Sequence, residues 1–135
     1  MQEFSYDIRV YYEDTDVGGI VYYANYLKFA ERARTEWLRS LGFNQHQMRE
    51  KAGIGFVVKQ CHVDYHAPAM LDDMITIHTH ITEQRKAGFS MQQRIMKNTL
   101  LLCTIDVVII CVNNAMKPTR IPVEVTEKIV AWQHQ

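Results

Sequence analysis

The segment 11–26 combines the residue types that carbonyl chemistry needs. Three carboxylates, Glu13, Asp14 and Asp16, lie within four positions, and the pair Gly18-Gly19 follows them. The glycines allow the backbone to come close to a ligand. An aromatic-rich stretch with helical spacing comes next, so the segment reads Tyr-Tyr-Glu-Asp-Thr-Asp-Val-Gly-Gly-Ile-Val-Tyr-Tyr-Ala-Asn-Tyr.

An acid just upstream of a helix N-terminus favours acyl transfer. Unpaired backbone N–H groups and the positive end of a helix dipole can together polarise a carbonyl or hold an anion. A carboxylate beside them can attack the carbonyl or activate water against it. The segment therefore predicts a site that cleaves an acyl bond.

The elements that position this segment follow from hydrophobic spacing. Apolar residues alternate over 4–12, which predicts a half-buried strand. Over 23–41 they recur every three or four residues, which predicts a long helix that ends at Gly42. A helical turn over 45–51 with Asn44 as N-cap, and a C-terminal helix opened by Pro122, complete the helices. Val125, Ile129 and Trp132 fall on one face of the last one.

The rest of the chain predicts strands. Four strand-like stretches, 55–65, 74–84, 88–97 and 100–112, are separated by short turns, which favour antiparallel hairpins. The order of strand, long helix and four strands predicts an α+β domain of about five antiparallel strands packed on one helix. A length of 135 residues predicts that 1–135 form a single domain.

Composition excludes several functional classes. With 15 basic and 15 acidic residues the net charge is zero, which argues against a nucleic-acid partner. Cys61, Cys103 and Cys111 form no CxxC pair and predict buried, reduced thiols. The N-terminus lacks a signal-peptide pattern, and the longest apolar stretch is too short to span a bilayer. We therefore expect a cytoplasmic location and no transmembrane segment.

Three blocks resemble a known family. Asp14-Thr-Asp-x-x-Gly-x-Val-Tyr-Tyr-x-x-Tyr26, Glu31-Arg-Ala-Arg-Thr-Glu36 and Tyr65-His-Ala-Pro-Ala-x-Leu-Asp-Asp73 resemble the hotdog-fold acyl-CoA thioesterases of the 4-hydroxybenzoyl-CoA thioesterase type. The second and third blocks narrow the resemblance to the Tol-Pal-associated (YbgC) branch. It extends from about residue 9 to about residue 122. It implies a hotdog fold, in which the sheet wraps around one long central helix, and a homodimer or homotetramer with active sites between protomers.

The resemblance also implies roles for individual residues. Asp16 matches the catalytic carboxylate, acting as nucleophile or base, whereas the residues alone favour a carboxylate that caps or braces the loop. Tyr23 matches the position whose backbone N–H binds the thioester oxygen, although many members of the branch carry His there. Asp14 is interpreted as a loop residue that accepts hydrogen bonds from backbone amides.

Substrate-binding roles are expected for six further residues. They are Gly19, Val21, Tyr26, His66, Arg85 and Lys86. The alternative for the tyrosines is aromatic packing at the start of the helix, and for Arg85 and Lys86 an ordinary solvated charge rather than a contact with the phosphates of CoA. Relatives often carry Ser where this chain has Gly88, so a hydroxyl contact from that turn is missing.

The expected reaction is hydrolysis of an acyl-CoA to free CoA and a carboxylic acid, without a metal or organic cofactor. His78 and His80 lie on one face of a strand, but no third ligand with zinc-like spacing accompanies them. Two alternatives stay open: hydrolysis of acyl groups from acyl carrier protein, and a non-catalytic acyl-carrier-binding or scaffold protein linked to the cell envelope. The acid and glycines of the first block favour an enzyme.

Overall fold

The computed structural model describes all 135 residues and forms an α+β fold. Five antiparallel strands form one sheet in the order β1-β3-β4-β5-β2. Their bounds are β1 Phe4–Arg9, β2 Ile54–Tyr65, β3 Met74–Arg85, β4 Gly88–Lys97 and β5 Leu100–Asn113. Three α-helices are present, α1 Asn25–Ser40, α2 Gln45–Ala52 and α3 Val123–Gln133, with a 3-10 turn at Tyr12–Asp14.

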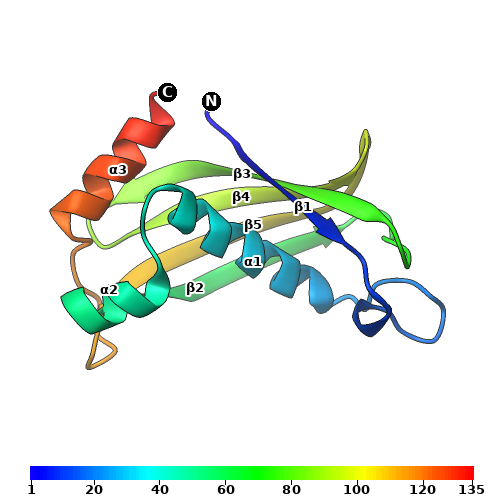
Figure 1. The fold of residues 1–135 in the computed structure, drawn as a ribbon, viewed down its shortest axis with the longest axis horizontal. Helices are drawn as coiled ribbons and strands as arrows, with labels where there is room; N and C mark the ends of the chain where they lie inside the picture. The colour runs from blue at the N-terminus through cyan, green and yellow to red at the C-terminus, as the bar shows by residue number, and fades with distance from the viewer.

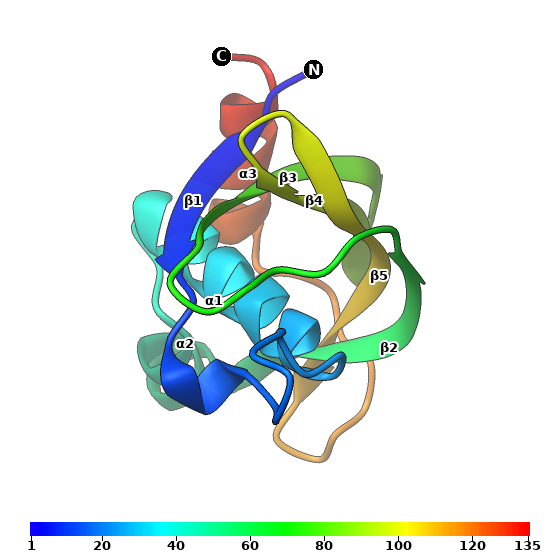
Figure 2. The ribbon, with the colours of Figure 1, turned by 90° about the vertical axis from the view of Figure 1, so that its right-hand side faces the viewer.

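Helix α1 lies against one face of the sheet, and Figures 1 and 2 show the strands curving around it. Its buried side chains follow the helical period expected from the sequence: Tyr26, Phe29, Ala30, Ala33 and Trp37. The two alanines leave room for the sheet to approach. Alternate residues of β3, β4 and β5 fill the other half of the core, because side chains along a strand point to opposite faces in turn.

The aromatic centre of the core lies toward the C-terminal end of α1. Trp37 packs edge-on against Phe89 and Trp132, with ring centroids 5.5 Å apart in each pair. Trp132 comes from α3, whose inner residues Val125 and Ile129 are buried as predicted. The C-terminal helix therefore closes the end of the core that is remote from the acidic loop (Figure 1).

The capping residues read from the sequence are confirmed. The side chain of Asn44 accepts the N–H of Gln47 at 2.8 Å, which caps α2. Gly42 has φ +97°, in the left-handed region that ends a helix. Pro122 occupies the N-cap of α3.

Three expectations were wrong in detail. The helix predicted over 23–41 is shorter in the structure, where the 16-residue α1 begins at Asn25, because Tyr22–Ala24 form a turn before helical bonding begins. The first strand ends at Arg9 rather than residue 12, since Val10 exchanges backbone hydrogen bonds with Asp72 and Asp73 and a 3-10 turn follows. Cys61 is exposed on β2, whereas Cys103 and Cys111 are buried, and burial raises the pKa of Cys103 to about 12.

Each of the three helices is too short or too polar to cross a membrane.

Candidate active site

The acidic segment folds into a tight hairpin at one end of the molecule, facing the viewer in Figure 2. The N–H of Gly19 donates to the carbonyl of Asp16, and the N–H of Asp16 donates to the carbonyl of Ile20, both at 3.0 Å. Gly19 has φ +75°, so the hairpin requires a backbone conformation that suits glycine. Gly18 has no positive φ.

The carboxylate of Asp16 is exposed and partly engaged within the hairpin. Its Oδ1 accepts the N–H of Gly18 at 3.0 Å, while its Oδ2 has no hydrogen-bond partner in the chain. The bracing role is therefore present in the structure. It leaves one oxygen available for chemistry, so bracing and catalysis are compatible in the same side chain.

The start of α1 presents free backbone donors. The carbonyl of Tyr22 accepts the N–H of Asn25 at 2.8 Å, and the N–H of Tyr22 donates to the carbonyl of Asp14 at 3.0 Å. The N–H groups of Tyr23 and Ala24 donate to no acceptor in the chain. Unpaired amides at the positive end of a helix dipole favour a carbonyl oxygen or an anion.

A cavity of about 300 Å³ lies beside these donors. It brings together four residues that the sequence singled out, Val21, Tyr23, Tyr26 and His66; Ile20, Tyr65, Ala67 and Pro68 complete the lining. The surface is mostly apolar and aromatic, as in many sites for small organic ligands. Asp16 does not line this cavity, but Ile20, its hydrogen-bond partner in the hairpin, does.

The segment 66–73 supports both the hairpin and the helix. The carbonyl of Ala69 accepts the N–H of Val21, and its N–H donates to the hydroxyl of Tyr26, both at 2.9 Å. The carbonyl of Gly19 accepts the N–H of Leu71 at 3.0 Å. Burial raises the pKa of Tyr26, so its hydroxyl stays protonated near neutral pH.

Asp14 is buried and anchors the loop to α1. Its two oxygens accept the backbone N–H of Tyr11 and the side-chain amide of Asn25, each at 2.8 Å. The prediction that Asp14 accepts a hydrogen bond from a backbone amide is confirmed. The bond from Asn25 was missed, because nothing in the sequence pairs that amide with this carboxylate.

Arg85 and Lys86 lie elsewhere in the chain. Arg85 is the last residue of β3 and Lys86 follows it, at the end opposite the hairpin and roughly 36 Å along the strand from Met74 at ~3.3 Å per residue. The Nη2 of Arg85 binds Glu83 at 2.8 Å and the hydroxyl of Ser90 at 2.9 Å. With Arg120 and the first turn of α3 they border a separate cavity of about 430 Å³.

Two further observations concern residues weighed from the sequence. A Cβ on Gly88 would lie 2.2 Å from the carbonyl oxygen of Ile109, so the β4–β5 backbone contact there has no room for a side chain.

The ring of His78 lies 3.0 Å from the hydroxyl of Ser5, and His80 is buried near Glu3. No group of three or more His, Cys, Asp or Glu side chains is arranged to hold a metal ion.

Tyr65 is a cavity residue to which the sequence assigned no role. Its hydroxyl donates to the carbonyl of Tyr23 at 2.9 Å, and its ring lies edge-on to that of Tyr26 with centroids 5.6 Å apart. The only sequence signal was its position directly before His66 in the third block.

Comparison with known proteins defines the class to which this fold and site belong. The sequence profile of the thioesterase-like superfamily matches residues 10–132. The chain therefore belongs to the thioesterase-like superfamily.

Particular relatives extend the match over most of the chain. It is 48% identical to the acyl-CoA thioesterase YbgC of Haemophilus influenzae over 123 residues, which cover 90% of each protein. It is 47% identical to the acyl-CoA thioester hydrolase YbgC of Escherichia coli over 122 residues, 88% of this chain and 90% of the relative. The crystal structure of a probable thioesterase from Bartonella henselae is 38% identical, with a TM-score of 0.84 over 89% of this chain and 99% of that one.

Proposed function

We propose that the protein is an acyl-CoA thioesterase and that it hydrolyses its substrate at the Tyr23 cavity, releasing free CoA and a carboxylic acid. One observation carries the assignment of the site: the N–H of Tyr23 lacks an acceptor at the start of α1, beside a cavity lined by apolar and aromatic groups. An ester-like carbonyl is the kind of group that such a donor stabilises as negative charge develops on its oxygen. The names of the relatives support the same activity.

In the proposed reaction, Asp16 supplies the carboxylate. It either attacks the thioester carbonyl, forming a mixed anhydride that water then cleaves, or removes a proton from the attacking water. In both routes the CoA thiolate leaves and is protonated, and the acyl group departs as a carboxylic acid. The free Oδ2 of Asp16 is the atom available for either role.

Substrate binding divides between two regions. Val21, Tyr26 and His66 line the cavity and are proposed to contact the acyl group, with Gly19 shaping the adjoining hairpin. Arg85 and Lys86 are proposed to bind the phosphates of CoA. Because they lie at the far end of β3, we infer that they serve the site of another protomer, which requires a homodimer or homotetramer.

The proposal includes the setting of the site. Residues 1–135 would act as one thioesterase domain of the hotdog type, with α1 as the central helix that the sheet wraps. We infer that the enzyme works in the cytoplasm, which agrees with its three free cysteines.

Acyl carrier protein is the alternative carrier of the acyl group, and an envelope-linked scaffold is the alternative without catalysis. A thiol-release assay separates them. The purified protein is given acyl-CoAs of increasing chain length, an aromatic acyl-CoA and the matching acyl-carrier-protein thioesters. Faster thiol release from CoA substrates supports the proposal, preference for the carrier protein supports the first alternative, and no release from any thioester refutes an enzyme.

A further inference from the structure

The two peptide groups that flank Tyr23 are each held by a hydrogen bond to their carbonyl oxygen. The carbonyl of Tyr22 accepts the N–H of Asn25, and the carbonyl of Tyr23 accepts the hydroxyl of Tyr65. Because a trans peptide group is planar, its N–H points away from its C=O. The first bond therefore sets the direction of the Tyr23 N–H, and the bond from Tyr65 sets the direction of the Ala24 N–H.

Neither of these two N–H groups donates to an acceptor in the chain. The side chain of Tyr23 is 63% exposed, and its ring contacts those of Tyr22 and Tyr65, with centroids 4.8 and 6.3 Å away. Without the Tyr65 hydroxyl, water would take its place on the Tyr23 carbonyl. Water imposes no direction, so the peptide would be free to rock about its flanking bonds.

Tyr65 is itself held rigidly. It is the last residue of β2, where its backbone pairs with Cys103 of β5, and the next N–H, that of His66, donates to the carbonyl of Leu102 at 2.8 Å. Its ring packs edge-on against the buried ring of Tyr26. Burial raises the pKa of Tyr65, so the hydroxyl remains a donor throughout the neutral and mildly alkaline range.

We propose that Tyr65 is a positioning residue that anchors the Tyr23 carbonyl to the sheet and so aims the free N–H of Ala24, beside that of Tyr23, at the thioester oxygen. This inference rests on the proposed function. The sheet thereby sets the direction of a donor that belongs to a loop. A small misalignment of such donors weakens binding of the developing oxyanion more than binding of the substrate.

The substitution Tyr65→Phe tests the role, since it removes the hydroxyl and keeps the ring that lines the cavity. We expect kcat for an acyl-CoA to fall about tenfold while KM changes by less than about twofold, because the lost interaction matters mainly in the transition state. The shape of the pH–rate profile should not change, since Tyr65 transfers no proton. Tyr12→Phe is the matched control: this phenol is 82% exposed on the same loop, outside the cavity, and its loss should leave the kinetics unaltered.

A second measurement does not depend on activity. In ¹⁵N-labelled protein, Tyr65→Phe should shift the amide signals of Tyr23 and Ala24, while core amides such as that of Ile105 stay in place. Tyr12→Phe should leave both loop signals unchanged.

Several results would overturn the proposal. Wild-type kcat in Tyr65→Phe would do so, as would a rise in KM with kcat preserved, which would make Tyr65 a substrate contact. Unmoved amide signals at Tyr23 and Ala24 would contradict the anchoring itself. If the proposed function itself is wrong, the wild-type protein will release no thiol from acyl-CoA. The amide measurement would then still decide whether Tyr65 orients the peptide between Tyr23 and Ala24.

Discussion

The carboxylate of Asp14 and the side-chain amide of Asn25 form a buried hydrogen bond, with 2.8 Å between Oδ1 and Nδ2. Both side chains are more than nine-tenths buried. Asn25 is the first residue of α1, and the other oxygen of Asp14 accepts the N–H of Tyr11. The carboxylate of Asp14 thus links the segment after β1 to the first residue of α1, the helix whose start presents the free amides.

We expect Asp14→Asn to destabilise the protein by about 1–3 kcal/mol, because an amide NH₂ would then face one of the two N–H donors, of which that of Asn25 is buried. Urea unfolding monitored by circular dichroism measures the free energy of unfolding. Glu13→Gln is the control, since Glu13 is exposed and should change stability by less than about 0.5 kcal/mol. Equal stability of the two variants would show that the Asp14–Asn25 bond is not an anchor. The loss of kcat should be smaller than for Asp16→Asn.

The two glycines of the hairpin should respond differently to substitution. A Cβ on Gly19 meets no atom within 4 Å, so the cost of Gly19→Val comes from its φ of +75° and amounts to about 1–3 kcal/mol of local strain. The hairpin can relieve that strain by shifting, and kcat/KM should then fall more than the melting temperature. Gly18→Ala, whose Cβ would make an ordinary 3.6 Å contact with Asp16, should be tolerated. Kinetics and melting on the same preparation decide, and unchanged kinetics in Gly19→Val would remove the hairpin from the site.

The carboxylate of Asp73, at the end of the segment 66–73, makes a contribution to stability that depends on pH. Burial by itself raises the pKa of Asp73, but hydrogen bonds from Lys97 Nζ (2.8 Å) and the Met70 N–H (2.9 Å) lower it below its ordinary value. A carboxylate whose pKa is lower in the folded state contributes stability above its unfolded pKa of about 3.9, and loses it as the pH falls through the folded value.

Lys97→Met should therefore be less stable than the wild type near neutral pH, and the difference should shrink below about pH 4. Urea midpoints measured from neutral to acid pH test this. Arg39→Met, which removes an exposed ion pair with Glu36, should show a small difference at every pH. A gap between Lys97→Met and wild type that stays constant into acid would mean that the ion pair does not support the fold.

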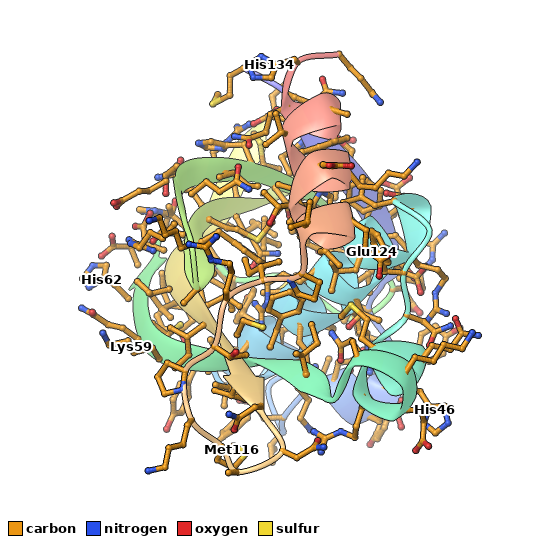
Figure 3. The ribbon with its side chains drawn as sticks, turned by 90° about the vertical axis from the view of Figure 1, so that its left-hand side faces the viewer. His46, Lys59, His62, Met116, Glu124 and His134 are labelled. Atoms are coloured by element: carbon orange, nitrogen blue, oxygen red, sulfur yellow. The ribbon has the colours of Figure 1, made fainter.

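Strand β2 is a long edge strand with one side unpaired. It is 12 residues long at one border of the sheet, with Val58 47% and Tyr65 48% exposed. Figure 3 shows Lys59 and His62 projecting outward from the same strand. Because a long unpaired edge is prone to pair with another chain, we expect light scattering to give a dimer or tetramer. Specific activity should fall on dilution as protomers separate. A monomer with full activity in dilute solution would contradict a site shared between protomers.

Much of the fold could be predicted because local patterns decide it. The alternation in β3 to β5, the helical spacing of α1 and the caps at Asn44, Gly42 and Pro122 depend on neighbouring residues, and all appear in the structure. The early end of β1 could not be predicted. It depends on Val10 pairing with Asp72 and Asp73, more than 60 residues away, and no local pattern reveals that contact.

The candidate site shows the same division. One short block of sequence supplies three residues that line the cavity, Val21, Tyr23 and Tyr26. They come together because they lie close in sequence, at and just before the start of α1. The contribution of Tyr65 could not be foreseen, because its hydroxyl reaches Tyr23 across 42 positions of sequence. Arg85 and Lys86 are far from the cavity because β3 is long and runs away from it. The alternating pattern predicts the length of this strand, but not its direction relative to the cavity.

The decisive measurement is thiol release from acyl-CoA by the wild type and by Asp16→Asn. An asparagine can still accept the N–H of Gly18 through its oxygen, so the hairpin and the melting temperature should be preserved. We expect the wild type to release CoA, and kcat of Asp16→Asn to be lower by roughly 10²-fold or more, because the nucleophile or base is lost. Glu13→Gln, on the same loop, should retain wild-type kcat. If folded Asp16→Asn released CoA at the wild-type rate, Asp16 would not be the catalytic carboxylate.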